Sequence, residues 1–286
     1  MQRRALLAGL AALLAGCSSL VAFNALAPRD RGGRRVLRDA AYGADPRQRI
    51  DVYAPTDIAA PAPVIVFIYG GSWDSGAKED YEFVGAAFAA QGFVTLVPDY
   101  RLVPDVRFPG FIEDCAAATR WAADHVAAHG GDPGRMVLVG HSAGAYNAVM
   151  LALDAHYLAD AGVDAARVRG VVGLAGPYDF LPLDVDATRN AFGQAADPQL
   201  TQPVRFARAG APPLLLLWGD ADTTVGVRNL QNLDRAMRTA GGAVESKIYP
   251  GVSHVDIMLA LSRPLRGRAP TLGDVTGFAR RVTAPT

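Results

Sequence analysis

The stretch RMVLVGHSAGAY, residues 135–146, decides the fold that this sequence predicts. Its four apolar residues, 136–139, have the length of a short buried strand, and a run of small residues typical of a helix follows at once. A chain that turns from strand to helix so quickly strains its central residue and pushes that side chain out of the turn. Gly140 and Gly144 are needed because a Cβ there would collide with the neighbouring strand and helix. We therefore expect an exposed Ser142 hydroxyl at a helix N-terminus, where an anion forming beside it is favoured; the alternative is a plain Gly-Ser linking turn.

Segments on both sides of this stretch alternate between strand-like and helix-like patterns. Residues 63–69 form a continuous apolar run, as a central strand covered on both faces should. The alternation predicts a largely parallel sheet with right-handed crossovers. Residues 176–211 contain no strand pattern, and we expect short helices or a small lid there. The expected strands are 36–42, 49–53, 63–69, 93–97, 136–139, 168–174, 213–218 and 244–249, and the other expected helices are 81–90, 111–128, 229–240 and 271–281.

Composition limits the classes of protein to which the chain can belong. Its 286 residues suit one large α/β domain, because no linker divides them. Lys plus Arg equal Asp plus Glu at 28 each, and no basic block stands out, so nucleic acid is not an expected partner. Hydrophobic residues make up 50% of the chain, which is enough for a large core.

The N-terminus has the pattern of an export signal. Arg3 and Arg4 precede the apolar run 5–15, which is shorter than the ~20 residues of a membrane-spanning helix. The run ends in LAGC, residues 14–17, which resembles the lipobox of bacterial lipoproteins, and the two arginines also resemble a twin-arginine signal. We expect a signal peptide at 1–16, lipidation of Cys17, a tether at 17–35 and a folded domain at 36–286.

Such processing would anchor the protein to a membrane of the bacterial cell envelope on the periplasmic side. Several acyl chains make a stable anchor where one does not. Ser18 after the cysteine favours the outer membrane. If Cys17 is instead an ordinary residue of a signal peptide, the protein is secreted. Cys115 is then the remaining thiol, and its helical spacing indicates a core residue rather than a nucleophile.

A serine at its free pKa is a poor nucleophile, so Ser142 requires a base, and a carboxylate must orient that base. His254 lies in a loop directly after a strand and is the preferred base of the five histidines. His141 is adjacent to Ser142 and is expected to point away from it. The others have no suitable setting: His125 and His129 lie one turn apart on a predicted helix opposite its apolar stripe, without the Glu of a zinc motif, and His156 has no motif.

The candidate acid lies in GDADTTV, residues 219–225, at the end of an apolar strand. The C-terminal ends of parallel strands are where such sheets place their chemistry. Asp222 is preferred because Asp220, immediately after the strand, is expected to shape the turn, whereas a residue two further along reaches toward His254. Asp256 is too near His254 in the chain to be favoured.

The order Ser142, Asp222, His254 is that of α/β-hydrolases. The chain resembles their carboxylesterase/lipase group, close to the hormone-sensitive-lipase-like, feruloyl/acetyl-xylan-esterase-like and isoprenylcysteine-methylesterase-like branches. The resemblance covers nearly all of residues 40–282. It implies an α/β-hydrolase fold, with a mostly parallel eight-stranded sheet flanked by helices and a small lid or none. The matching stretches are IDVYAP (50–55), YGGSW (69–73), DYR (99–101), GGDP (130–133) and GHSAG (140–144).

The resemblance also implies an oxyanion hole, made by the backbone N–H groups of Gly71, Ser72 and Ala143. Tyr69 stands where the family has histidine, which leaves the bracing of this turn open. Trp73 either walls the acyl pocket or belongs to the core.

The expected activity is hydrolysis of a small-molecule ester with a short or medium acyl group through an acyl-enzyme, without cofactor or metal. The alternatives are an amidase or peptidase of formamidase or dipeptidase type with the same triad, and a lipid-anchored binding module without turnover.

Overall fold

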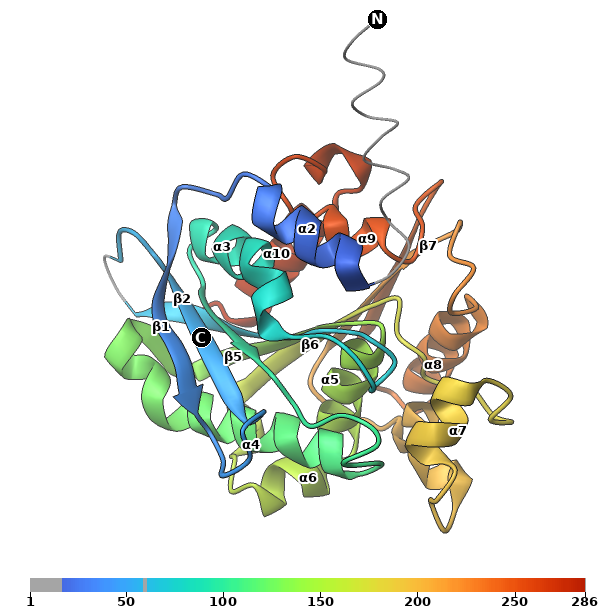
Figure 1. Cartoon of the computed structure of the whole chain (residues 1–286). Coiled ribbons are helices and arrows are strands. Elements are labelled where there is room, and N and C mark those ends of the chain that lie inside the picture. The colour runs from blue at the N-terminus through green and yellow to red at the C-terminus, as the bar shows by residue number, and fades with distance from the viewer. Residues whose placement is uncertain (1–16, 59–60, 286) are drawn as a thin grey trace, which may run out of the picture.

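The computed structural model of the chain describes residues 17–58 and 61–285. Its centre is one eight-stranded sheet in the order β1-β2-β4-β3-β5-β6-β7-β8 (Figure 1). β2 pairs antiparallel with β1 and with β4, and all the other neighbouring strands pair in parallel. The expected mostly parallel eight-stranded sheet is therefore confirmed. The strands are β1 (Gly33–Ala41), β2 (Arg49–Pro55), β3 (Ala62–Ile68), β4 (Val94–Pro98), β5 (Gly131–His141), β6 (Val168–Leu174), β7 (Leu214–Gly219) and β8 (Val244–Tyr249).

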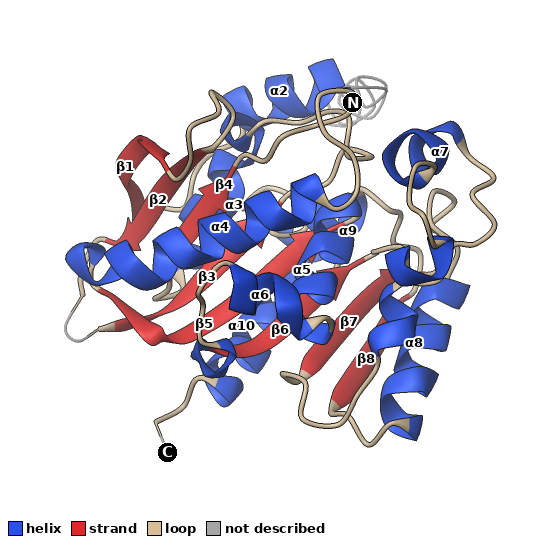
Figure 2. Cartoon of the chain, turned by 90° about the horizontal axis from the view of Figure 1, so that it is seen from below, coloured by secondary structure: helices blue, strands red, loops and turns tan. Residues whose placement is uncertain are grey.

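Helices cover both faces of the sheet (Figure 2). α3 (Glu82–Ala90) and α10 (Thr271–Val282) lie on one face, and α4 (Gly110–His125), α5 (Ala143–Leu153) and α8 (Arg228–Thr239) lie on the other. The remaining α-helices are α2 (Cys17–Leu26), α6 (Ala155–Asp160), α7 (Asp186–Phe192) and α9 (Asp256–Leu259). Short 3-10 helices are η1 (Lys78–Tyr81), η2 (Val126–His129), η3 (Ala165–Arg167), η4 (Pro198–Thr201), η5 (Pro203–Phe206) and η6 (Arg266–Arg268). Residues 176–211 thus carry short helices, as expected.

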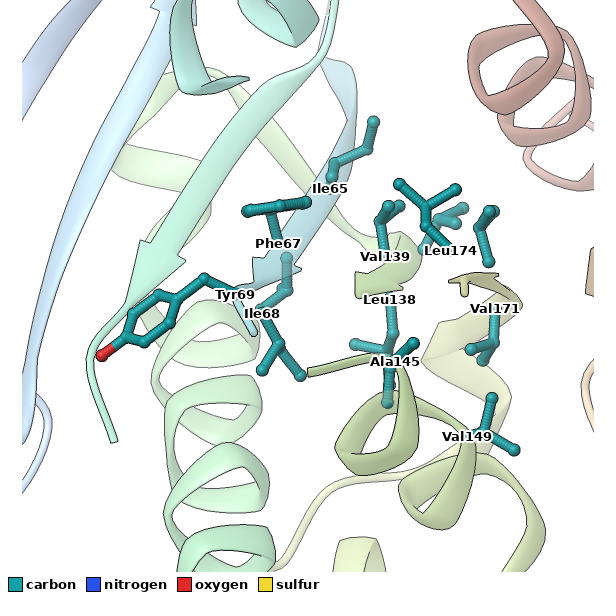
Figure 3. Close-up of a cluster of buried hydrophobic side chains, with 14 of the residues drawn as sticks. Ile65, Phe67, Ile68, Tyr69, Leu138, Val139, Ala145, Val149, Val171 and Leu174 are labelled. Atoms are coloured by element: carbon teal, nitrogen blue, oxygen red, sulfur yellow. The ribbon is translucent and has the colours of Figure 1, made fainter. Parts of the chain in front are cut away.

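The core fills both sides of the central strands (Figure 3). Successive strand residues point to opposite faces, so Phe67 and Val139 pack on one side and Leu138 on the other. Ala145 and Val149 of α5 pack against the second side, and all five of these residues are fully buried. β3 is buried without a break from residue 64 onward and β5 from residue 136 onward, which explains the continuous apolar runs there. β5 ends directly before Ser142 and pairs with β3 on one side and β6 on the other.

The predicted tether at 17–35 is wrong. α2 occupies the first part of it, and β1 begins already at Gly33. Asn24 donates from Nδ2 to the carbonyl of Glu79 (2.6 Å) and accepts from the N–H of Phe83 (3.3 Å). The Phe23 ring meets the Phe83 ring edge-on, with centroids 5.4 Å apart. Apolar residues at helical spacing let this segment bury one face against α3 and η1, so it folds onto the domain.

The predicted signal peptide, residues 1–16, lies outside the described residues. Among the residues that the structure does describe, none of the helices has the length and apolar character needed to cross a bilayer.

Candidate active site

The turn between β5 and α5 holds Ser142 in a strained backbone conformation, with φ 54° and ψ −122°. Its N–H donates to the carbonyl of Leu174 on the neighbouring strand β6 (2.8 Å). Neither flanking glycine tolerates a side chain. A Cβ on Gly140 would lie 2.2 Å from the Gly144 carbonyl oxygen, and one on Gly144 would lie 2.1 Å from the Ile68 carbonyl oxygen. The close approach of three backbone segments therefore explains the glycines and presents the serine side chain at the start of α5.

Ser142, His254 and Asp222 form one hydrogen-bonded chain. His254 Nε2 lies 2.9 Å from Ser142 Oγ, and His254 Nδ1 lies 2.7 Å from Asp222 Oδ2. Asp222 follows β7 and His254 follows β8, and these parallel strands end at the same edge of the sheet as β5. The Asp222 side chain is fully buried, and that of His254 is 11% exposed. The structure thus brings together all three residues that the sequence proposed.

The surroundings of Asp222 keep its carboxylate ionised. Burial, the largest single influence, raises its pKa, but hydrogen bonds from His254 and from the backbone outweigh burial and leave the pKa below its usual value. The N–H groups of Thr224 (2.8 Å) and Val225 (2.9 Å) both donate to Oδ1. An ionised carboxylate accepts only, so His254 Nδ1 carries the proton and Nε2 is left to accept from Ser142.

The two other aspartates near the site support its loops instead. Asp220 accepts from the N–H of Gly251 (2.6 Å), which ties the turn after β7 to the turn after β8. Asp256 accepts from Ser253 Oγ (2.8 Å) and from Arg268 (2.7 Å). The choice of Asp222 over both follows from these contacts.

His141 has a contact that the sequence did not reveal. Its Nε2 lies 2.8 Å from the main-chain oxygen of His254, and the two ring centroids are 4.9 Å apart. A carbonyl oxygen only accepts, so Nε2 must carry the proton. Burial, assisted by the nearby imidazole of His254, lowers the pKa of His141 to about 3, which keeps the ring neutral. His141 does point away from Ser142, but it points to the backbone of His254 and fixes the loop that carries that imidazole.

The loop after β3 passes directly against Ser142. A Cβ on Gly70 would lie 2.9 Å from Ser142 Cβ. The next residues, Gly71 and Ser72, both have positive φ, at 120° and 53°. Within the described part of the chain, the N–H groups of Gly71, Ser72 and Ala143 donate to no protein acceptor. Unpaired backbone donors next to a serine side chain are what an oxyanion requires.

Tyr69 braces this loop in place of the histidine that the family resemblance led us to expect. Its hydroxyl donates to Asp99 Oδ1 (2.6 Å) and accepts from Arg47 Nη2 (2.9 Å), which also donates to the Gly76 carbonyl (2.9 Å). Tyr100 donates to the Tyr69 carbonyl oxygen (3.1 Å). Burial raises the pKa of Tyr69 well above its usual value, so the phenol stays protonated and donates. The loop after β3 is therefore anchored by the hydrogen bonds of Tyr69, although the histidine is missing at this position.

Trp73 is buried, with 3% of its surface exposed. Its Nε1 donates to Asn147 Oδ1 (3.2 Å), and it lies in a cluster of aromatic rings. The partners come from α4, α5, α7 and the segment before α7: Phe111, Tyr146, Phe192 and Phe180. Of the two interpretations of Trp73, burial favours the core, and contact with a substrate stays a prediction. Cys115 is buried as well, as expected of a core thiol.

Among the described residues, no group of three or more His, Cys, Asp or Glu side chains is arranged to hold a metal ion. The candidate site contains a serine hydroxyl, an imidazole, a carboxylate and backbone N–H groups without a protein acceptor among the described residues.

Known proteins with similar sequences are esterases. Isoprenylcysteine alpha-carbonyl methylesterase from Arabidopsis thaliana is 27% identical over 84% of this chain and 61% of its own length. Esterase LipC of Mycobacterium tuberculosis is 31% identical over 77% of this chain and 59% of its own length. The chain thus spans about three fifths of the length of these curated relatives.

Solved structures show the same fold. An inhibited Esterase B from Lactobacillus rhamnosis superposes with a TM-score of 0.81 at 22% identity, covering 97% of this chain and 96% of that one. The carboxylesterase EstE1, cloned from a metagenomic library, superposes with a TM-score of 0.76 at 20% identity, and the match covers 93% of this chain and 94% of EstE1. The fold is thus that of the α/β-hydrolases, as the sequence predicted. The BD-FAE family model matches residues 50–237, well over half of the chain, and the chain belongs to that family.

Proposed function

We propose that the chain is a serine hydrolase that cleaves carboxylic esters with Ser142 as nucleophile, His254 as general base and then acid, and Asp222 as the group that orients the base. The observation that carries the proposal is the continuous hydrogen-bonded chain of 2.7 and 2.9 Å through the His254 imidazole. His254 Nε2 takes the hydroxyl proton as Ser142 Oγ attacks the ester carbonyl, and returns that proton to the departing alcohol. The same nitrogen then activates a water that hydrolyses the acyl-enzyme.

The oxyanion that forms in both steps is assigned to the N–H groups of Gly71, Ser72 and Ala143. Two observations support this assignment. These N–H groups have no protein acceptor among the described residues, and Gly70 lies close to Ser142. Such donors stabilise a transition state by roughly 3 to 4 kcal/mol each, because they are already oriented where charge develops.

The proposed substrate is a small-molecule ester with a short or medium acyl group. The names of the related methylesterases and of Esterase LipC support ester rather than amide cleavage. The test is a series of p-nitrophenyl esters from acetate to laurate, run beside the matching p-nitroanilides with wild type and Ser142→Ala. Fastest turnover of short or medium esters, lost in the variant, supports the proposal. Preference for the anilides would favour an amidase, and no Ser142-dependent turnover would favour a binding module.

We also propose that Cys17 is acylated and anchors the protein to a membrane of the bacterial cell envelope. The support is the LAGC sequence and the preceding short apolar run. The mass of the N-terminal peptide of the protein isolated from its native host tests this. A lipid-modified Cys17 as the first residue is expected, and an unmodified Cys17 would contradict the anchor.

A further inference from the structure

The outer face of α2 is apolar although its inner face is already packed against the domain. The inner face consists of Leu20, Phe23 and Asn24, which contact the domain or lie buried, and Ala27, directly after the helix, is buried as well. The opposite face of the described side chains consists of Val21, Ala22, Ala25 and Leu26, without a polar group. Leu26 is 82% exposed and Val21 is 51% exposed. A helix with one buried face normally presents polar side chains on the other, so this outer face is suited to an apolar neighbour.

The position of α2 in the chain indicates what that neighbour is. The described part of the helix extends back to Cys17, the residue proposed to carry the anchor. The segment PRDRGGRR, residues 28–35, follows it directly and contains four arginines and one aspartate. α2 is packed onto the domain and includes Cys17. A lipid on Cys17 would therefore hold the domain close to the bilayer, because no free tether separates the two.

A second basic segment lies beside the first. Arg266 pairs with Asp30 (2.8 and 3.1 Å), which joins the loop 263–268 to the segment after α2. Arg268 pairs with Asp256, and Arg29 and Arg35 pair with Glu82. Arg263 of this loop and Arg31 and Arg34 of the other segment are exposed and have no ion-pair partner among the described residues. Figure 1 shows α2 and α9, which precedes this loop, at the same end of the molecule. Apolar side chains flanked by arginines are typical of protein surfaces that lie in the headgroup region of an anionic bilayer.

We propose that the outer face of α2 lies in the headgroup region of an anionic membrane and holds the domain flat against it. The inference rests on the proposed anchor for the approach to the membrane and goes beyond the proposed chemistry. A lipid anchor on a free tether would bring the domain near the bilayer without seating this helix in it.

The test uses the full chain, reconstituted in vesicles of phosphatidylethanolamine and phosphatidylglycerol. Val21→Cys and Leu26→Cys variants receive a thiol-reactive fluorophore, and quenching by nitroxide-labelled lipid is compared with quenching by aqueous iodide. Matched controls are Leu200→Cys and Ile248→Cys, because these apolar residues are 54% and 45% exposed and belong to η4 and β8. The wild-type chain is the blank, since its Cys115 is buried and a lipidated Cys17 has no free thiol.

The proposal predicts that nitroxide lipid quenches the labels at positions 21 and 26 at least about twofold more than those at 200 and 248, and that iodide shows the reverse order. Iodide quenching at 21 and 26 equal to that of the controls would overturn it. Shielding of position 26 from both quenchers, with cross-linking to a second copy, would also overturn it in favour of a dimer. Hydrolysis of p-nitrophenyl acetate by the same samples reports on the proposed chemistry separately, and release of the wild type by alkaline carbonate reports on the anchor.

Discussion

Replacing His141 by phenylalanine tests whether the base is held through its own backbone. The substitution keeps a planar ring in a buried site and removes the Nε2–H that donates to the His254 carbonyl at 2.8 Å. Loss of the donor to a buried carbonyl lowers the free energy of unfolding by about 1 to 3 kcal/mol. The imidazole of His254 loses one of the contacts that fix its loop, and a displacement of about 1 Å at a catalytic group lowers turnover by roughly 100-fold.

The assay is kcat and KM for p-nitrophenyl acetate, with urea unfolding of the same samples. We expect kcat of His141→Phe to fall about 10- to 100-fold at nearly unchanged KM, because the change affects the base rather than substrate binding. His141→Gln is the matched control, since its side-chain amide presents an N–H at about the distance of Nε2 and should restore most of kcat. A Phe variant with wild-type kcat, or a Gln variant as impaired as the Phe variant, would refute the positioning role.

Three other changes have defined outcomes. Asp222→Asn should lower kcat by about 10⁴-fold at neutral pH, measured with the same ester, because an amide does not hold the required tautomer of His254. Tyr69→Phe removes the hydroxyl between Asp99 and Arg47, and urea unfolding should show a loss of about 1 to 3 kcal/mol together with a reduced kcat, whereas unchanged values would mean that the loop is braced elsewhere. Because the pKa of His141 is lowered to about 3, the unfolded chain binds a proton between roughly pH 6.5 and 3 that the folded chain does not, so stability must fall with falling pH. Relative to His141→Gln, the wild type should lose about 1.4 kcal/mol of unfolding free energy per pH unit in that window, and parallel curves would contradict the buried neutral ring.

The parts of the site that local patterns specify were predictable from the sequence. Gly140 and Gly144 mark a turn that only glycine permits, and the order of serine, aspartate and histidine follows the ends of recognisable strands. Asp222 could be distinguished from Asp220 because it lies two residues further along the chain from the end of β7, where its side chain reaches His254.

The parts that depend on distant contacts were not predictable. His141 and the His254 carbonyl are 113 residues apart, and nothing in the GHSAG stretch indicates that partner. The hydroxyl of Tyr69 finds Asp99 30 residues away. The wrong prediction at residues 17–35 has a different origin. The arginines and glycines after Pro28 suggested a tether, but Leu20 and Phe23 have helical spacing and pack this segment against the core.

The role of Ser142 as nucleophile is tested by covalent labelling with a fluorophosphonate and mapping of the labelled residue by peptide mass spectrometry. We expect one label per chain on Ser142, formed only by the folded protein and much more slowly in His254→Ala, with loss of ester hydrolysis in proportion to labelling. A label on another serine, or continued hydrolysis by fully labelled protein, would contradict it.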